Sequence, residues 1–178
     1  MTHDRLLDSN RCYSLQVQAL LEELAAYPDE ALNRTPPDGG WSAVQTLTHL
    51  ILSEESALAY VRKKLGFGST FQRAGWGGKW RSFLLWLALS SPFKFRVPAV
   101  VSQEQLPPFA TMAQTRARWQ QSRAAWEVFF EQMPPQLLDK AVFKHPRAGK
   151  IGWGDMLGFF STHVSRHRQQ ALRAARQA

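Results

Sequence analysis

The sequence is poor in cysteine, with Cys12 alone among 178 residues. One cysteine cannot form an internal disulfide, and it cannot supply a structural zinc site that is built on several thiolates. Because Cys12 falls within a helical pattern, we expect it to be a small, buried apolar residue. A metal site in this chain therefore needs ligands other than a set of thiolates.

Long apolar stretches are also missing. No run approaches the roughly 18 apolar residues that indicate a membrane-spanning helix. The N-terminal sequence MTHDRLLDSN lacks the apolar core behind a basic start that marks a secretory signal peptide. We therefore predict a cytoplasmic protein without a membrane span.

The composition is that of a globular protein with an excess of positive charge. Hydrophobic residues make up 44% and charged residues 20%, and the length suits a single domain over residues 1–178. The net charge of +8 admits an anionic partner such as nucleic acid or lipid headgroups. However, the basic residues, Arg118 and Arg123 among them, are scattered as on a solvated surface. No nucleic-acid motif frames them, so a basic nucleic-acid or membrane-surface module is the last of three alternatives.

Four long helical patterns, and no convincing strand, follow one another along the chain. They cover approximately residues 9–27, 42–65, 111–132 and 153–177. The second pattern begins sharply, because Ser42 is a good N-cap and Gln45 occupies the capping-box position. The sequence therefore predicts an all-α fold, a four-helix bundle with a long crossover between its second and third helices.

The crossover, residues 66–110, is rich in Gly, Trp and Phe. Within it, residues 79–89 can form a short apolar helix. Flanking Lys and Arg are compatible with an interfacial membrane anchor, but we favour a lid that packs over the bundle. A connector of this length lets the second and third helices point the same way. The start of the second helix would then lie at the same end as the end of the fourth.

Two histidines, His163 and His167, interrupt the apolar stripe of the last helical pattern. At about 100° per residue they share a face with Met156, Phe160 and Val164. Positions i and i+4 lie on one side of a helix, and burying both rings without a shared partner leaves hydrogen bonds unmet. A metal ion is such a partner, since neutral imidazole is the commonest metal ligand.

His49 is the candidate third ligand. It lies about 10 Å from the start of its helix, and the histidine pair lies about 15–20 Å from the end of the last helix, so the predicted topology brings them to similar depths. On the helical wheel, however, His49 sits well away from the main apolar stripe, and periodicity alone predicts a surface residue. Leu52 and Tyr60, on other faces of this helix, allow a second buried side.

Two stretches of the sequence together resemble the DinB/YfiT-like superfamily, and its DinB_2 branch in particular. They are WSAVQTLTHLILSE, residues 41–54, and STHVSRHRQQ, residues 161–170. The family pattern is a tryptophan and a small residue at a helix opening, then a histidine followed by Leu and a downstream Glu. Near the C-terminus comes His-x-x-x-His, followed shortly by Gln. The resemblance extends to the chain length, the helix order and the element with Pro146 and Gly149 ahead of the last helix.

The resemblance implies a four-helix bundle that binds one divalent metal ion through His49, His163 and His167. It also implies a metal-dependent hydrolase or thiol S-transferase, with a small-molecule substrate and, for the transferase, a low-molecular-weight thiol. Three neutral imidazoles leave the ion an open position, where bound water has a pKa of about 7 or a thiol is held as thiolate. Imidazole donors suit Zn²⁺ and Ni²⁺ alike.

Four further residues have two interpretations each. Glu54 and Glu55 can serve as a general base, although glutamates on a helix are more often solvated. His145 and Trp153 can line the pocket, although a histidine beside a proline is usually exposed and a tryptophan at helical spacing is more often part of the core.

Acceptors that orient the histidine rings are expected among Gln45, Gln169 and Gln170. The second of the three alternatives, after an enzyme and ahead of the basic module, is a metal-stabilised bundle that binds a small ligand without catalysis. The aromatic content is also compatible with a homodimer that pairs through an exposed apolar face.

Overall fold

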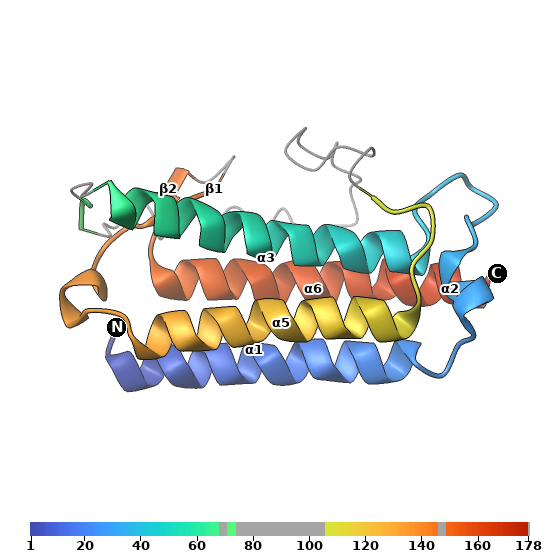
Figure 1. The fold of residues 1–178 in the computed structure, drawn as a ribbon, viewed down its shortest axis with the longest axis horizontal. Helices are drawn as coiled ribbons and strands as arrows, with labels where there is room; N and C mark the ends of the chain where they lie inside the picture. The colour runs from blue at the N-terminus through green and yellow to red at the C-terminus, as the bar shows by residue number, and fades with distance from the viewer. Residues whose placement is uncertain (68–70, 74–105, 146–148, 178) are drawn as a thin grey trace.

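Four long helices form the body of the protein in this computed structural model, which describes residues 1–67, 71–73, 106–145 and 149–177. They are α1 (His3–Leu24), α3 (Ala43–Gly66), α5 (Met112–Glu131) and α6 (Trp153–Arg176). All four lie along the long axis of the molecule, with α1 and α6 running one way and α3 and α5 the other (Figure 1). The start of α3 therefore lies at the same end as the end of α6, and the predicted all-α fold is confirmed.

Side-chain caps fix where three of these helices begin. Ser42 Oγ accepts from the Gln45 backbone N–H at 3.2 Å while Gln45 Oε1 accepts from the Ser42 N–H at 3.1 Å. This is the capping box that the sequence predicts, and Thr111 with Gln114 forms a second one at the start of α5. Thr2 caps α1, which explains why α1 begins at His3, earlier than the helical pattern from residue 9 indicates.

The prediction of no strand is wrong at one place. Strands β1 (Phe143–His145) and β2 (Gly149–Ile151) form an antiparallel pair with Phe143 opposite Ile151. Three residues are too few for the alternation of polar and apolar side chains to stand out in a sequence. Two short elements also escaped prediction, the helix α2 (Asp29–Asn33) and the 3-10 turn η2 (Pro135–Leu137).

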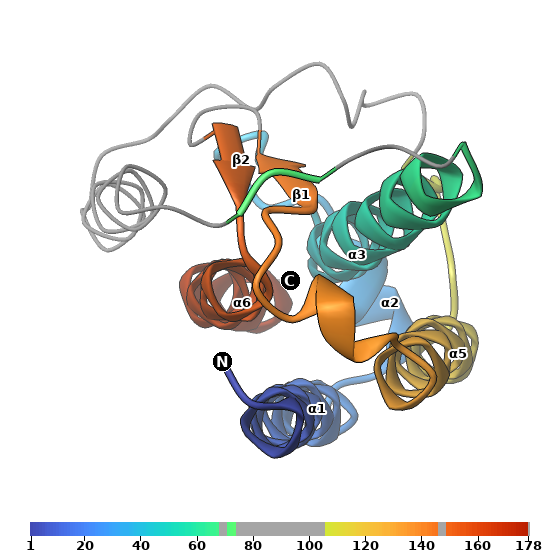
Figure 2. The same ribbon diagram turned by 90° about the vertical axis from the view of Figure 1, so that its left-hand side faces the viewer.

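The core of the bundle is aromatic between α5 and α6, which lie diagonally across it (Figure 2). Trp126 lies with its ring centroid 5.1 Å from that of Phe130 and 6.1 Å from that of Phe160. All three side chains are fully buried, and large aromatic side chains dominate core energetics. The view along the bundle shows how α1, α3, α5 and α6 surround this core, with the β1–β2 pair above α3 and α6 (Figure 2).

Two predictions about single residues are wrong. Cys12 is exposed, because Tyr13 and Val17 are the neighbouring residues of α1 that face the core. Arg123 is only 7% exposed and forms an ion pair with Glu54 inside the bundle. A periodicity analysis treats every arginine as a surface residue and so cannot find a buried ion pair.

No helix among the described residues is both long and apolar enough to cross a membrane. Most of the predicted crossover and lid, residues 66–110, and all of the helix predicted at 79–89 lie outside the residues that the structure describes.

Candidate metal centre

Three histidines from two antiparallel helices meet between α3 and α6. One ring nitrogen from each of His49, His163 and His167 lies within 4.8 Å of the other two. The ring centroids of His163 and His167 are 4.6 Å apart, and that of His49 is 5.0 Å from each. His49 and His163 are buried, and His167 is half-buried. The topology thus brings together the three residues that the sequence singles out.

His49 is buried although its position on the helical wheel predicts a surface residue. The helix that carries it, α3, packs against α5 on one side and α6 on another, and every residue of 46–51 is buried. Five residues after His49, Glu54 points about 140° away around the helix, into the interior beside α5. A helix with two buried sides has no single apolar stripe, so periodicity gave the wrong environment for His49.

The geometry of the cluster fits a metal ion. His49 Nε2 lies 3.1 Å from His163 Nε2, close to the separation of about 3.3 Å between two nitrogens on one tetrahedral Zn²⁺. His49 Nδ1 is buried without a hydrogen-bond partner among the described residues. A buried polar atom left unpaired is costly, so this nitrogen could gain from a partner such as a metal ion.

Burial keeps His49 and His167 neutral at physiological pH. Desolvation, with the neighbouring His167 as a smaller cause, lowers the pKa of His49 from 6.5 to about 4. Desolvation also lowers the pKa of His167 to about 4, against a hydrogen bond to Gln170 that raises it. A neutral imidazole is the form that binds metal. His49 and His167 are therefore already in the metal-binding form near pH 7.

Two aromatic rings flank the histidines. The Trp41 ring lies 5.1 Å from the His49 ring, and Phe159 stacks on His163 at 5.1 Å with an interplanar angle of 20°. Both rings are half-buried, so they restrict solvent around the cluster. Phe159 was missed in the sequence, although its position four residues before His163 indicates that the two side chains are neighbours on α6.

Neither candidate general base on α3 joins the histidines. Glu54 accepts from Tyr13 Oη and Trp119 Nε1 at 2.6 Å each, and from Arg123 Nη1 at 2.8 Å. Glu55 is held by Arg118 through two hydrogen bonds of 3.0 and 2.7 Å. Both carboxylates are therefore engaged by other partners, and the metal-ligand group found among the described residues contains histidine only.

Of the two candidate pocket-lining residues, Trp153 lies away from the histidines, and the side chain of His145 is not described. Trp153 is 1% exposed, donates from Nε1 to the Leu137 carbonyl at 2.8 Å and stands about 15 Å along α6 from His163. That position corresponds to the core interpretation of this tryptophan. The backbone of His145 pairs with Gly149 in the hairpin, but its side chain is not among the described ones.

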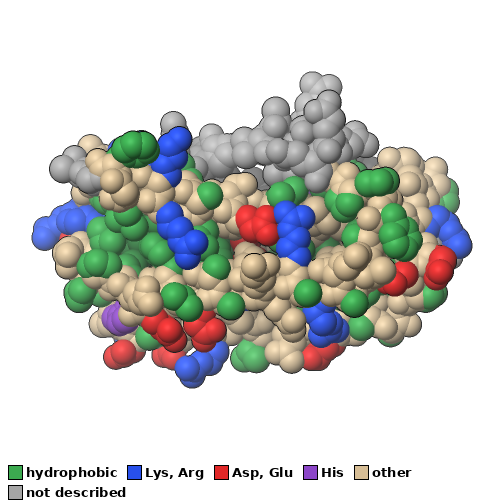
Figure 3. All heavy atoms as spheres, viewed as in Figure 1, with side chains coloured by type: hydrophobic (Ala, Val, Ile, Leu, Met, Phe, Trp, Pro, Cys, Tyr) green, Lys and Arg blue, Asp and Glu red, His purple; other side chains and the backbone are tan. Residues whose placement is uncertain are grey.

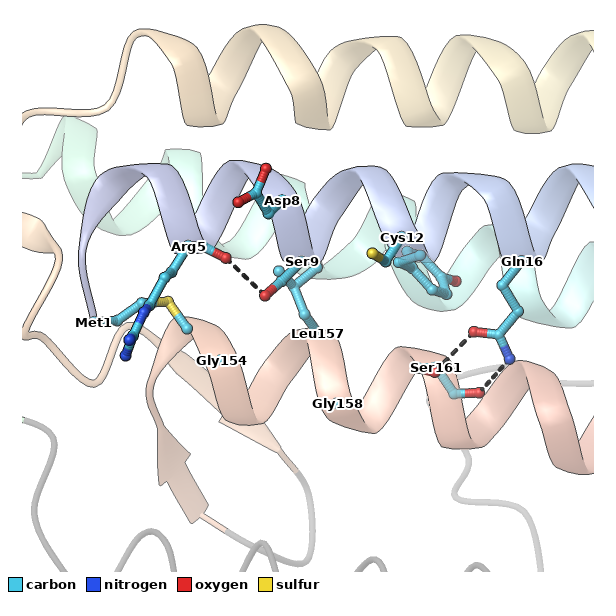
Figure 4. A pocket seen from close by; sticks show the side chains of 11 residues that line it. Met1, Arg5, Asp8, Ser9, Cys12, Gln16, Gly154, Leu157, Gly158 and Ser161 are labelled. Carbon is cyan, nitrogen blue, oxygen red and sulfur yellow. Dashed lines mark hydrogen bonds between the residues drawn. The ribbon is translucent and has the colours of Figure 1, made fainter.

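A separate hollow of about 660 Å³ lies between α1 and α6. Cys12, Gly154 and Gly158 are among its lining residues, and Gln16 is hydrogen-bonded to Ser161 at one end of it (Figure 4). None of the three clustered histidines lines this hollow. The hollow and the histidine cluster are therefore distinct features, and only the second brings metal-binding groups together.

The three glutamines predicted as acceptors have different roles. Gln170 Oε1 lies 2.9 Å from His167 Nδ1. Gln45 belongs to the capping box of α3, and Gln169 is exposed.

The fold and the site together define a class of protein, an α-helical bundle in which two antiparallel helices supply three histidines that could hold a metal ion. The family model for the DinB superfamily matches residues 13–171. The chain therefore belongs to the DinB superfamily. Comparison with curated proteins and with solved structures finds no match.

Proposed function

We propose that the protein is a metal-dependent enzyme in which His49, His163 and His167 hold one divalent ion, Zn²⁺ or Ni²⁺. It uses that site to activate water or a low-molecular-weight thiol, as a hydrolase or a thiol S-transferase. The observation that carries the proposal is the convergence of three histidines, at least two of them neutral near pH 7, from two helices onto one point.

The donor set supports catalysis rather than a closed structural site. A divalent ion held there would supply an open coordination position at which a water or a thiol loses its proton near neutral pH. Imidazole ligands add no negative charge, so they would leave the charge of such an ion available to an anion. With Glu54 bound to Arg123 and Glu55 to Arg118, neither carboxylate of α3 is free to act as the base.

The surroundings of the rings support the same function. Trp41 and Phe159 pack on His49 and His163, which fixes ring orientation and excludes water from two sides of the cluster. Charge interactions are stronger where water is excluded, so an ion held here would attract a nucleophile more strongly than it would in water.

Metal analysis of purified protein tests the first half of the proposal. After reconstitution with Zn²⁺ or Ni²⁺ and desalting, we expect one equivalent of metal in the wild type and none in His163→Ala. His3→Ala is the matched control, because His3 lies at the far end of α1 with its Nε2 2.7 Å from the Phe130 carbonyl. Wild-type protein that stays metal-free after reconstitution would overturn the proposal.

Turnover tests the second half. The loaded protein is assayed on ester, amide and electrophilic alkyl substrates, each with and without a low-molecular-weight thiol such as cysteine. Product formation without thiol identifies a hydrolase, and thiol-dependent product identifies a transferase. A protein that binds one metal ion and turns over none of these substrates would instead be the non-catalytic, metal-stabilised bundle.

The described surface does not favour a basic binding module. Acidic and basic side chains are interspersed on the face shown in Figure 3, and the partly exposed Arg118 and Arg168 are each paired with a glutamate. Binding to phosphate backbones relies on unpaired Lys and Arg and falls steeply with salt.

A further inference from the structure

The ring nitrogens of His167 have different surroundings. Nδ1 faces Gln170 Oε1 at 2.9 Å, and Gln170 lies one turn further along α6, where i and i+3 side chains meet. An amide oxygen only accepts hydrogen bonds, so this contact requires the proton of the neutral His167 ring to sit on Nδ1. The lone pair is then on Nε2, the other ring nitrogen.

We propose that Gln170 is the positioning residue of the metal site: it sets the His167 tautomer so that Nε2 is the ligand atom. The inference rests on the proposed function, since it assigns a role toward the ion held by the histidines. Metal-binding histidines almost always donate their other N–H to an acceptor, and removing that acceptor weakens metal binding.

The choice of a glutamine has a chemical consequence. A carboxylate in this position would orient the ring equally well, but it would add a negative charge beside the ion. The Gln170 amide orients the ring and adds none, so the site keeps a positive charge for a nucleophile of the thiolate or hydroxide type. The role also falls on Gln170 by elimination, because Gln45 caps α3 and Gln169 is exposed.

His49 differs from His167 in this respect. His49 Nδ1 has no hydrogen-bond partner among the described residues. Of His49 and His167, only His167 has an acceptor for its second ring nitrogen among the described residues. Loss of the Gln170 acceptor should therefore weaken metal binding directly.

Zinc affinity, measured by competition with a chromophoric chelator, tests the inference. We expect Gln170→Leu to bind Zn²⁺ about 10- to 100-fold more weakly than the wild type. Gln169→Leu, the same change at the exposed neighbouring residue, should bind as the wild type does. Gln170→Glu, which keeps an acceptor, should bind at least as tightly as the wild type. Wild-type affinity in Gln170→Leu, or an equal loss in Gln170→Glu, would overturn the inference.

The tautomer itself provides a readout that needs no metal. In ¹⁵N-histidine NMR spectra of the metal-free protein, the His167 ring should carry its proton on Nδ1 in the wild type and shift toward Nε2–H in Gln170→Leu. Should the leucine variant fail to fold, Gln170→Met, unbranched and of similar length, removes the same acceptor. An unchanged tautomer in the folded variant refutes the role of Gln170, whereas a wild type that binds no metal refutes the proposed function and leaves the tautomer result standing.

Discussion

Helix α3 carries two buried polar clusters that differ in how completely their polar atoms are paired. Around Glu54, both carboxylate oxygens are used, by Tyr13 and Trp119 on one and by Arg123 on the other. Around His49, the ring has one nitrogen 3.1 Å from His163 and one nitrogen with no partner among the described residues. Buried polar groups in native proteins are nearly always paired.

The two clusters on α3 also differ in where their partners come from. The Glu54 cluster joins α1, α3 and α5, and its pairs are satisfied from within the chain. The His49 cluster joins α3 and α6, and the described residues leave His49 Nδ1 without a partner. The polar atoms of Glu54 are thus fully paired, whereas those of His49, five residues away on α3, are not.

The largest expected effect comes from breaking the Glu54 cluster. Glu54→Ala leaves the Arg123 charge buried and unpaired, which should cost about 3–5 kcal/mol of unfolding free energy. Glu55→Ala is the matched control: its ion pair with Arg118 is partly exposed, and its loss should cost less than about 1 kcal/mol. Urea denaturation measures both, and equal losses would show that the buried network is not structural.

Metal addition should act on the second cluster alone. Zn²⁺ at about 1,000 times its dissociation constant should stabilise the wild type by about 4 kcal/mol. His49→Ala should lose this stabilisation, whereas the double variant Glu54→Leu/Arg123→Met, which replaces the buried pair by apolar groups, should keep it. Thermal melts with and without Zn²⁺ give the answer, and a metal-induced shift that persists in His49→Ala would contradict the assignment.

The pH dependence of the metal-free protein follows from the two lowered pKa values. The unfolded chain has His49 and His167 at their ordinary pKa of 6.5, and the folded protein has both at about 4. Above pH 6.5 the rings are neutral in both states and stability is fully present. Between pH 6.5 and 4 the unfolded chain takes up protons that the folded one does not, so stability falls, by roughly 3 kcal/mol for one such shift.

Denaturation midpoints from pH 8 to pH 4, in the presence of a chelator, measure this decline. Replacing His49 by Leu should make it shallower. A decline that begins only below pH 5 and is unchanged in His49→Leu would assign it to carboxylates instead.

The smallest expected change in stability is that of replacing His49 in the absence of metal. In metal-free protein at pH 8, His49→Leu should change the unfolding free energy by less than about 1 kcal/mol, because relief of the unpaired Nδ1 offsets the lost contacts. A destabilisation as large as that of Glu54→Ala would mean that the histidines, too, are held for stability.

Local signals in the sequence predicted much of this fold. The capping box of Ser42 and Gln45 forms within one helical turn, and His163 and His167 lie within one helix. Both features can therefore be predicted from a single segment of the sequence. The parallel course of α3 and α5 follows from the length of the connector between them. The depth of His49 in its helix made it the candidate third ligand and the family resemblance supported it, and the structure brings the three residues together.

The features that the sequence did not predict depend on contacts between separate helices. The burial of His49 depends on α3 packing against two helices at once, and the Arg123–Glu54 pair joins positions 69 residues apart. Neither feature can be recognised from the spacing of apolar residues within one helix. The sequence also could not show which of the three candidate glutamines accepts a hydrogen bond from a histidine ring. The capping role of Gln45 and the exposure of Gln169 become apparent only in the folded chain.

Anomalous diffraction from crystals of the zinc-loaded protein, recorded on both sides of the zinc absorption edge, tests the metal site most directly. A single strong peak should lie between α3 and α6, with a ring nitrogen of His49, of His163 and of His167 at about 2.0–2.1 Å. No peak among these three rings, or a peak held by other side chains, would contradict the assignment.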